Sequence, residues 1–168
     1  MGNSIIYFDK YIEKAGEGDV VGLLELGMVR METSLKSLSE EQWHVRYLTG
    51  KWSVKELVSH ITDTERIMTY RALRFSRNDG TPLPPFDEDW YVTHAGADSR
   101  AGEEHLEEFL AVRRATLLFF KGLNKEQLKL AGSFSGYSPL SVEAIGRVIV
   151  GHAEHHLGVL GERYGVLE

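Results

Sequence analysis

The sequence predicts an all-α protein, a four-helix bundle with a long crossover between its second and third helices. Four long segments carry apolar residues at three- and four-residue steps, which is the spacing of an amphipathic helix. Alternation of apolar and polar residues, the pattern of a half-buried strand, is nearly absent. With 168 residues and no cysteine, the chain is long enough to bury a core without disulfides. We therefore expect one domain over residues 1–168.

The first predicted helix runs from about Asp19 to Leu38. Its apolar stripe consists of Val20, Leu24, Met28, Met31, Leu35 and Leu38. The second starts after Ser53, where SVKE forms a capping box. In this motif the Ser53 hydroxyl accepts a hydrogen bond from the backbone of Glu56, and the Glu56 carboxylate accepts one from the backbone of Ser53. Its stripe continues through Leu57, Ile61, Met68, Ala72 and Phe75.

The third predicted helix runs from about Glu103 to Lys121, with Gly122 as its stop. Its inward residues are Leu106, Phe109, Leu110, Leu117 and Phe120. The fourth starts after Ser141, continues to Tyr164 and ends at Gly165, a residue that favours helix termination. Its apolar residues include Val142, Ile145, Val148, Ile149 and Leu160.

A long connection, Arg77 to Arg100, separates the second and third helices. Its three prolines prevent a regular helix through its middle. Its apolar residues are too numerous for disorder: Pro84, Pro85, Phe86, Trp90 and Tyr91. Ordered loops of this length in compact domains are usually functional. We expect an ordered crossover that packs over one end of the bundle.

The charge balance excludes several classes of protein. The net charge is −6 and no dense run of lysine or arginine occurs, so a nucleic-acid partner is not expected. No apolar run approaches the roughly 20 residues that span a bilayer, so no membrane association is expected. The first residues lack the pattern of a secretory signal, which makes the cytoplasm the expected location.

Three of the seven histidines lie in GHAEHHLGVL, Gly151 to Leu160. At 100° per residue, His152 and His156 fall on the core-facing stripe one turn apart. His155 falls at the edge of that face, and Glu154 points to the opposite, solvated side. Two inward imidazoles cost several kcal/mol unless their nitrogens find partners. They are either hydrogen-bonded core histidines or ligands of one metal ion.

The second helix supplies a third imidazole, His60, at the flank of its apolar stripe. A partly exposed histidine bonded to a neighbouring helix is the simpler interpretation. Together with His152 and His156, however, it would form a facial set of three nitrogens with open positions, as in catalytic metal sites. Because the chain has no cysteine, a metal here would have only nitrogen and oxygen ligands.

Other active-site motifs are absent. HAEHH is not H-E-x-x-H, because no glutamate directly follows His152. Glu56 and His60 are four residues apart, not the three of the di-iron Glu-x-x-His motif. The sequence contains no G-x-S-x-G, P-loop or G-x-G-x-x-G motif, so serine-hydrolase, nucleotide-binding and Rossmann folds are not indicated.

Three segments resemble the DinB-like family of metalloenzymes and span most of the chain in the family's order. They are GKWSVKELVSHITDTERI, DGTPLPPFDEDWYV with the preceding RALRF, and IVGHAEHHLGVLGERYG. The resemblance implies a four-helix bundle of DinB/YfiT-like topology, often a homodimer. It also implies one divalent metal ion, usually zinc or nickel, with His60, His152 and His156 as ligands and His155 as a non-ligating neighbour. Many relatives have glutamine three residues after the last ligand, where this chain has Val159.

The resemblance leaves three functions open. Characterised relatives include transferases and an isomerase that use a low-molecular-weight thiol, so we expect a small-molecule substrate and a thiol made nucleophilic by the metal. Metal-dependent hydrolysis is the second, with a general base drawn from Asp87, Glu88 and Asp89. These three carboxylates are otherwise a solvated acidic turn. The third is a non-catalytic metal-binding module.

The remaining candidates have simpler interpretations. We expect Arg71 and Arg74 on a solvated helix face, with binding of an anionic cosubstrate as the alternative. Trp52 and Trp90 are expected as core anchors, with a pocket wall as the alternative. Three histidines without a partner pattern are expected at the surface or in loops: His44, His94 and His105.

Overall fold

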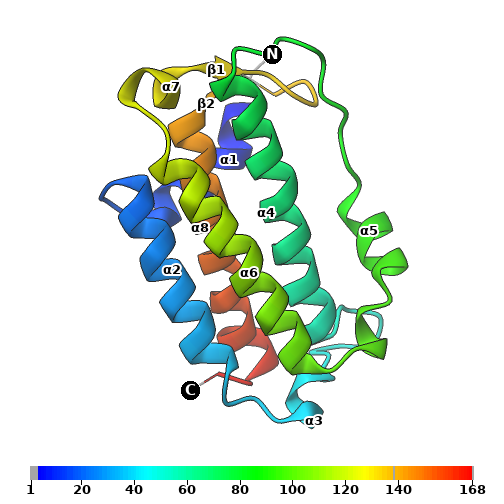
Figure 1. Cartoon of the computed structure of the whole chain (residues 1–168). Coiled ribbons are helices and arrows are strands. Elements are labelled where there is room, and N and C mark those ends of the chain that lie inside the picture. The colour runs from blue at the N-terminus through cyan, green and yellow to red at the C-terminus, as the bar shows by residue number, and fades with distance from the viewer. Residues whose placement is uncertain (1–3, 138, 168) are drawn as a thin grey trace.

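The computed structural model describes residues 4–137 and 139–167, and its frame is the predicted four-helix bundle (Figure 1). The long helices are α2 (Val20–Leu35), α4 (Val54–Ser76), α6 (Gly102–Lys121) and α8 (Val142–Val159). The only strands among the described residues are β1 (Ala131–Gly132) and β2 (Leu140–Ser141), an antiparallel pair. The all-α prediction is confirmed. The single domain over residues 1–168 stays a prediction, and residues 1–3, 138 and 168 lie outside the described part.

Side-chain caps begin three of the long helices, and the predicted capping box at Ser53 is one of them. The Asp19 carboxylate accepts from the Gly22 backbone at 3.0 Å, and the Ser141 hydroxyl accepts from the Ala144 backbone at 3.0 Å. At Ser53 both bonds of the capping box with Glu56 are formed. These bonds satisfy backbone N–H groups that have no partner inside the helix.

The last helix ends close to the expected position. α8 continues into one π-helical turn, η2 (Leu160–Tyr164), and Gly165 follows at φ 62°. This left-handed conformation suits glycine, which has no Cβ. Two short helices complete the ends of the bundle, α3 (Glu40–Trp43) and α7 (Lys125–Lys129). No helix in the described ranges has the length and apolar character needed to cross a membrane.

The connection between α4 and α6 runs the length of the bundle beside α4 (Figure 1). It contains α5 (Glu88–Ala95) and a 3₁₀ turn, η1 (Ala97–Ser99). Because α4 and α6 point in the same direction, the chain has to return from the end of α4 to the start of α6. The long crossover is confirmed, but the expectation that it packs over one end of the bundle is wrong.

A helix before the four long ones, α1 (Ser4–Ala15), was not predicted. It packs along α8, with Phe8, Tyr11 and Ala15 buried. The apolar spacing of these residues is the signal that identifies it in the sequence. A helix this short gains its stability from tertiary packing, in this case from its contact with α8.

The contact of α1 with α8 depends on Gly151. A Cβ atom at this position would lie 1.7 Å from the Tyr11 backbone oxygen. We expect Gly151→Ala to displace α1 and to lower the free energy of unfolding by about 1–3 kcal/mol, as for other overpacked sites. Urea denaturation measures the loss, and hydrogen exchange should localise it to α1.

The control is Gly161→Ala in η2, where an added Cβ meets no atom within 4 Å. This variant should be neutral or stabilised by up to about 1 kcal/mol, because alanine favours helix more than glycine does. Equal stability of Gly151→Ala and wild type, with unchanged exchange in α1, would contradict the proposed close contact.

A polar layer crosses the middle of the bundle. It contains the buried ion pair of Arg113 and Glu65, together with His60 and His152. On one side lies an apolar cluster that includes Leu24, Met68, Phe75, Phe120 and Ile145. On the other side lies a second cluster that includes Met31, Trp43, Ile61, Phe109 and Leu160. Each long helix contributes residues to both clusters, and the polar layer consists of residues of α4, α6 and α8.

Candidate metal centre

The pairing of α4 with α8 brings His60, His152 and His156 together. The His152 Nε2 lies 3.1 Å from the His60 Nε2 and 3.2 Å from the His156 Nε2. Each ring places one nitrogen within 4.8 Å of the other two. His152 and His156 are neighbours because they lie one turn apart on α8. His60, 92 residues before His152, joins them only through the packing of the two helices.

Burial keeps these imidazoles neutral. Burial lowers the pKa of His60 to about 4 and, with a contribution from His60, that of His156 to about 2. The pKa of His152 is well below its ordinary value, first because of burial and then because of the other two rings. At neutral pH each ring therefore has one unprotonated nitrogen. Neutral imidazole is the form that binds metal ions.

The donor set fits a divalent ion. Zinc ligands at about 2.0–2.1 Å from the ion lie roughly 3.0–3.4 Å apart, which agrees with the two Nε2 separations. Without a cation, the shared Nε2 of His152 cannot make ideal hydrogen bonds to both neighbours, because a neutral ring nitrogen is either donor or acceptor. The buried His156 Nδ1 has no hydrogen-bond partner within the described part of the chain. The side chain of Val159, one turn later, has no acceptor atom.

Aromatic rings cover the three histidines on two sides. Trp52 lies tilted against His60, with 4.9 Å between ring centroids, and Tyr11 of α1 meets His152 edge-on at 5.4 Å. The Tyr164 hydroxyl donates to the Trp52 carbonyl oxygen at 2.8 Å, which holds the loop before α4 against η2. The surroundings of the site are thus largely apolar, so polar interactions within it are strong.

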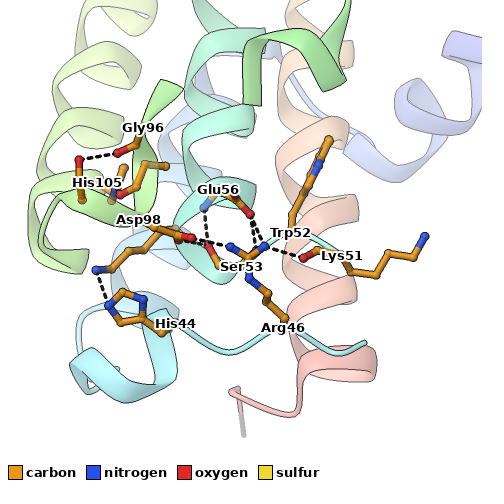
Figure 2. Close-up of polar contacts among 12 residues, drawn as sticks. His44, Arg46, Lys51, Trp52, Ser53, Glu56, Gly96, Asp98 and His105 are labelled. Atoms are coloured by element: carbon orange, nitrogen blue, oxygen red, sulfur yellow. Dashed lines mark hydrogen bonds and ion pairs between the residues drawn. The ribbon is translucent and has the colours of Figure 1, made fainter. Parts of the chain in front are cut away.

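A polar network fixes the loop that carries Trp52 (Figure 2). Arg46 donates to the Lys51 carbonyl oxygen and to the Glu56 carboxylate, both at 2.6 Å, and also pairs with Asp98 of η1. The Ser53 hydroxyl donates to Asp98 at 2.6 Å. The start of α4, the loop and the end of the crossover are therefore joined at the base of the site.

Two cavities of similar size meet the histidines. One, of about 310 Å³, is lined by His152 together with Thr64, Arg71 and Glu88. The other, of about 320 Å³, is lined by His156, Trp52 and Asp89, among others. A larger hollow of about 1060 Å³ lies between α2, α3 and α6, and none of the seven histidines lines it. The two smaller cavities are therefore the ones that reach the three histidines.

The acidic turn lies beside these cavities. Asp87 caps α5 by accepting from the Trp90 backbone at 3.0 Å. The pKa of Glu88 is raised by partial burial and by Asp89 and Asp87. Asp87, Glu88 and Asp89 are all exposed, as expected for a solvated acidic turn. Glu88 and Asp89 nevertheless each line a cavity that reaches the histidines.

Several single-residue expectations need correction. His105 was expected at the surface or in a loop but is buried on α6, where its Nε2 donates to the Ala97 carbonyl oxygen at 2.9 Å. Glu154 is not solvated: it pairs with Arg30 of α2 at 3.1 Å. Arg71 is buried rather than on a solvated face, and Trp90 is exposed rather than a core anchor, stacked on His94. Exposure of His44 and His94, and the position of His155 beside the triad, agree with expectation.

Glu65 and Arg113, two charged residues of the core, were not predicted from the sequence. They are 48 residues apart, and each lies on a helix with several other charged residues, so neither stands out by composition. Arg113 occupies an inward position between Phe109 and Leu117, and that break in the apolar stripe of α6 is the signal that identifies it.

Comparisons with known proteins agree with this architecture. The model of the DinB superfamily matches residues 23–160. The chain belongs to the DinB superfamily. A protein of Oceanobacillus iheyensis named "Putative metal-dependent hydrolase OB0413" is 25% identical over 129 residues, which cover 76% of this chain and 73% of that protein.

Two solved structures are similar in fold. YfiT from Bacillus subtilis, described as a probable metal-dependent hydrolase with an unusual four-helix bundle topology, has a TM-score of 0.73 at 18% identity. The match covers 94% of this chain and 87% of YfiT. A mycothiol-dependent maleylpyruvate isomerase has a TM-score of 0.70 at 11% identity, with 84% of this chain and 59% of the isomerase covered. These likenesses show the fold.

Proposed function

We propose that this protein is a metal-dependent enzyme that transfers a low-molecular-weight thiol to an electrophilic small molecule. His60, His152 and His156 would hold one divalent ion, zinc or nickel, both of which accept imidazole ligands. The observation that carries the proposal is a cluster of three neutral rings that two cavities reach, one of about 310 Å³ at His152 and one of about 320 Å³ at His156. Two cavities at one centre suit a reaction of two substrates.

A bound divalent ion would lower the pKa of a thiol, so that the thiolate is the nucleophile at neutral pH. The chain itself contributes three neutral ligands and the aromatic cover of Trp52 and Tyr11, which limits access of water. Because the protein has no cysteine, the reacting sulfur has to come from the cosubstrate. Small thiols stay reduced in the cytoplasm, which is the location expected from the sequence.

The second candidate is hydrolysis of an ester or amide. The observation that favours it is the raised pKa of Glu88, whose carboxylate lines the cavity of His152 and is available as a general base. The names of the Oceanobacillus iheyensis and Bacillus subtilis proteins also point in this direction. A module that binds metal without turnover is the third. The expected homodimer stays a prediction.

The test uses protein purified without a histidine tag, loaded with zinc or nickel and mixed with bacillithiol and monochlorobimane. In the expected reaction the thiol sulfur bonds to the bimane carbon, chloride leaves and the thiol proton passes to solvent. We expect conjugation at least about tenfold above that of EDTA-treated protein, because the nucleophile depends on the ion. Fluorescence of the conjugate measures the rate.

The His156→Ala variant should lose this rate and His155→Ala, altered next to the proposed ligands, should keep it. Metal-dependent hydrolysis of 4-nitrophenyl acetate without conjugation would replace transfer by hydrolysis. Tight metal binding with neither activity would favour the non-catalytic module.

A further inference from the structure

Arg71 is a buried cation without a carboxylate partner. It lies on α4, toward the C-terminal end from His60, and is 4% exposed. Within residues 4–137 and 139–167, no acidic oxygen lies within the 4 Å of an ion pair with it. Burial lowers its pKa, and arginine nevertheless stays charged in proteins. The contrast is Arg113, the other fully buried arginine, which Glu65 neutralises.

The guanidinium of Arg71 keeps donors available in its plane. Its guanidinium carbon lies 3.9 Å from the ring centroid of Phe134 and 5.8 Å from that of Phe86, and Tyr137 interacts with it electrostatically. Its hydrogen bonds are to the Met68 sulfur at 3.4 Å and the Pro84 carbonyl oxygen at 3.3 Å. The group has five N–H donors in a planar fork that matches a carboxylate. Neutral acceptors of this kind do not neutralise its charge.

Arg71 lines the same cavity of about 310 Å³ that His152 reaches. Thr64, which lies between His60 and Arg71 on α4, lines the same cavity, and its buried hydroxyl has no hydrogen-bond partner among the described residues. Arg71 follows His60 by 11 residues, or about 16 Å along the helix axis. The rest of the lining is mostly apolar: Phe8, Tyr11, Met68, Pro85, Phe86 and Val148. The cavity thus offers a cationic end, a free hydroxyl and apolar walls on the way to the histidines.

Glu88 is the one carboxylate among the described residues that line this cavity. It is exposed, and it forms no ion pair within 4 Å with Arg71. The Arg71 end of the cavity therefore carries a positive charge that no carboxylate of the described residues neutralises.

We propose that this cavity binds the carboxylate of a small, largely apolar organic acid, paired with Arg71 and hydrogen-bonded to Thr64. This inference rests on the proposed function, which makes the three histidines the reactive centre. It adds that one of the two substrates is an organic acid. Thr64 and Arg71 follow His60 by about one and three helical turns, so a carboxylate held by both lies on one side of the histidines and the acid reacts at its other end.

The test compares binding of phenylacetate and its neutral isostere phenylacetamide to the full chain, by ligand-observed NMR, after EDTA treatment and again with zinc. The wild type should bind the acid more tightly than the amide by on the order of tenfold or more, because charge-assisted pairs are strong. The Arg71→Met variant should lose this preference in both states. Because the EDTA-treated protein has no metal, failure of the metal site leaves this result unaffected.

Arg74→Met is the matched control. Arg74 pairs with Asp79 and donates to the Thr81 carbonyl oxygen at 3.1 Å, so it holds the same crossover but does not line the cavity. This variant should keep the preference for the acid. Equal loss in both variants would assign Arg71 a purely structural role and overturn the proposal. Absence of any preference in the wild type, or binding of neither probe, would also overturn it.

Two further variants cover the case in which Arg71→Met does not fold. Arg71→Lys keeps the charge but loses the fork, and it should weaken acid binding without abolishing the preference. Thr64→Val removes the hydroxyl at nearly constant shape, and it should weaken acid binding by about two- to tenfold with little effect on the amide. Unchanged acid binding in both would overturn the proposal. Retained metal-dependent conjugation with no acid preference would overturn this inference alone.

Discussion

Replacement of Glu65 by leucine is expected to lower the free energy of unfolding by about 3–5 kcal/mol, the usual effect of removing one partner of a buried ion pair. The Arg113 side chain is fully buried and donates to Glu65 from Nε and from Nη2, both at 2.8 Å. In the variant its charge would stay in the core, because arginine cannot deprotonate. The Leu24 carbonyl oxygen, at 3.3 Å, would be its remaining acceptor. Urea denaturation followed by circular dichroism measures the change.

Two controls separate this effect from a general intolerance of substitution. Arg66→Ala removes a half-exposed pair with Glu108 and should cost at most about 1 kcal/mol. The double variant Glu65→Leu/Arg113→Met, which removes both charges, should be more stable than Glu65→Leu alone. A Glu65→Leu variant within about 1 kcal/mol of wild type would show that the pair does not hold the bundle together.

Replacement of His152 by alanine is expected to reduce the affinity for zinc by more than about 100-fold, the upper range for loss of a group that only supports a ligand. His152 is the central member of the triad, with its Nε2 3.1 and 3.2 Å from those of His60 and His156. Its loss leaves only the His60 and His156 nitrogens as ligands, with no imidazole between them. Elemental analysis of tag-free protein measures occupancy directly.

The thermal midpoint gives a second measurement of the same loss. Zinc at about 100 times its Kd should stabilise the wild type by about 2.7 kcal/mol and should leave His152→Ala unchanged. The control is His155→Ala, because that half-buried ring packs on Tyr11 and belongs to no pair of facing nitrogens. Stoichiometric zinc in His152→Ala, or loss of zinc in His155→Ala alone, would show that the wrong imidazoles were assigned.

The helices were predictable because their signals are local. Apolar spacing and the capping residues Asp19, Ser53 and Ser141 act within one or two turns, so the sequence locates four helices within a few residues. The spacing of His152 and His156 is equally local, and it selects them over His155. α1 was missed even though Phe8, Tyr11 and Ala15 have helical spacing, because its stability comes from α8.

The remaining features depend on which helix lies beside which. The sequence alone determined an all-α bundle, a long crossover and two inward imidazoles on the last helix. Only the tertiary structure decided that α4 and α6 are parallel, that Glu65 meets Arg113, that His60 reaches His152, and that Arg71 is buried beside the same cavity. The physical reason is range: a hydrogen bond or an apolar stripe within one helix acts over a few residues. Charges and imidazoles on different helices interact only after packing has brought them within a few ångströms and excluded water.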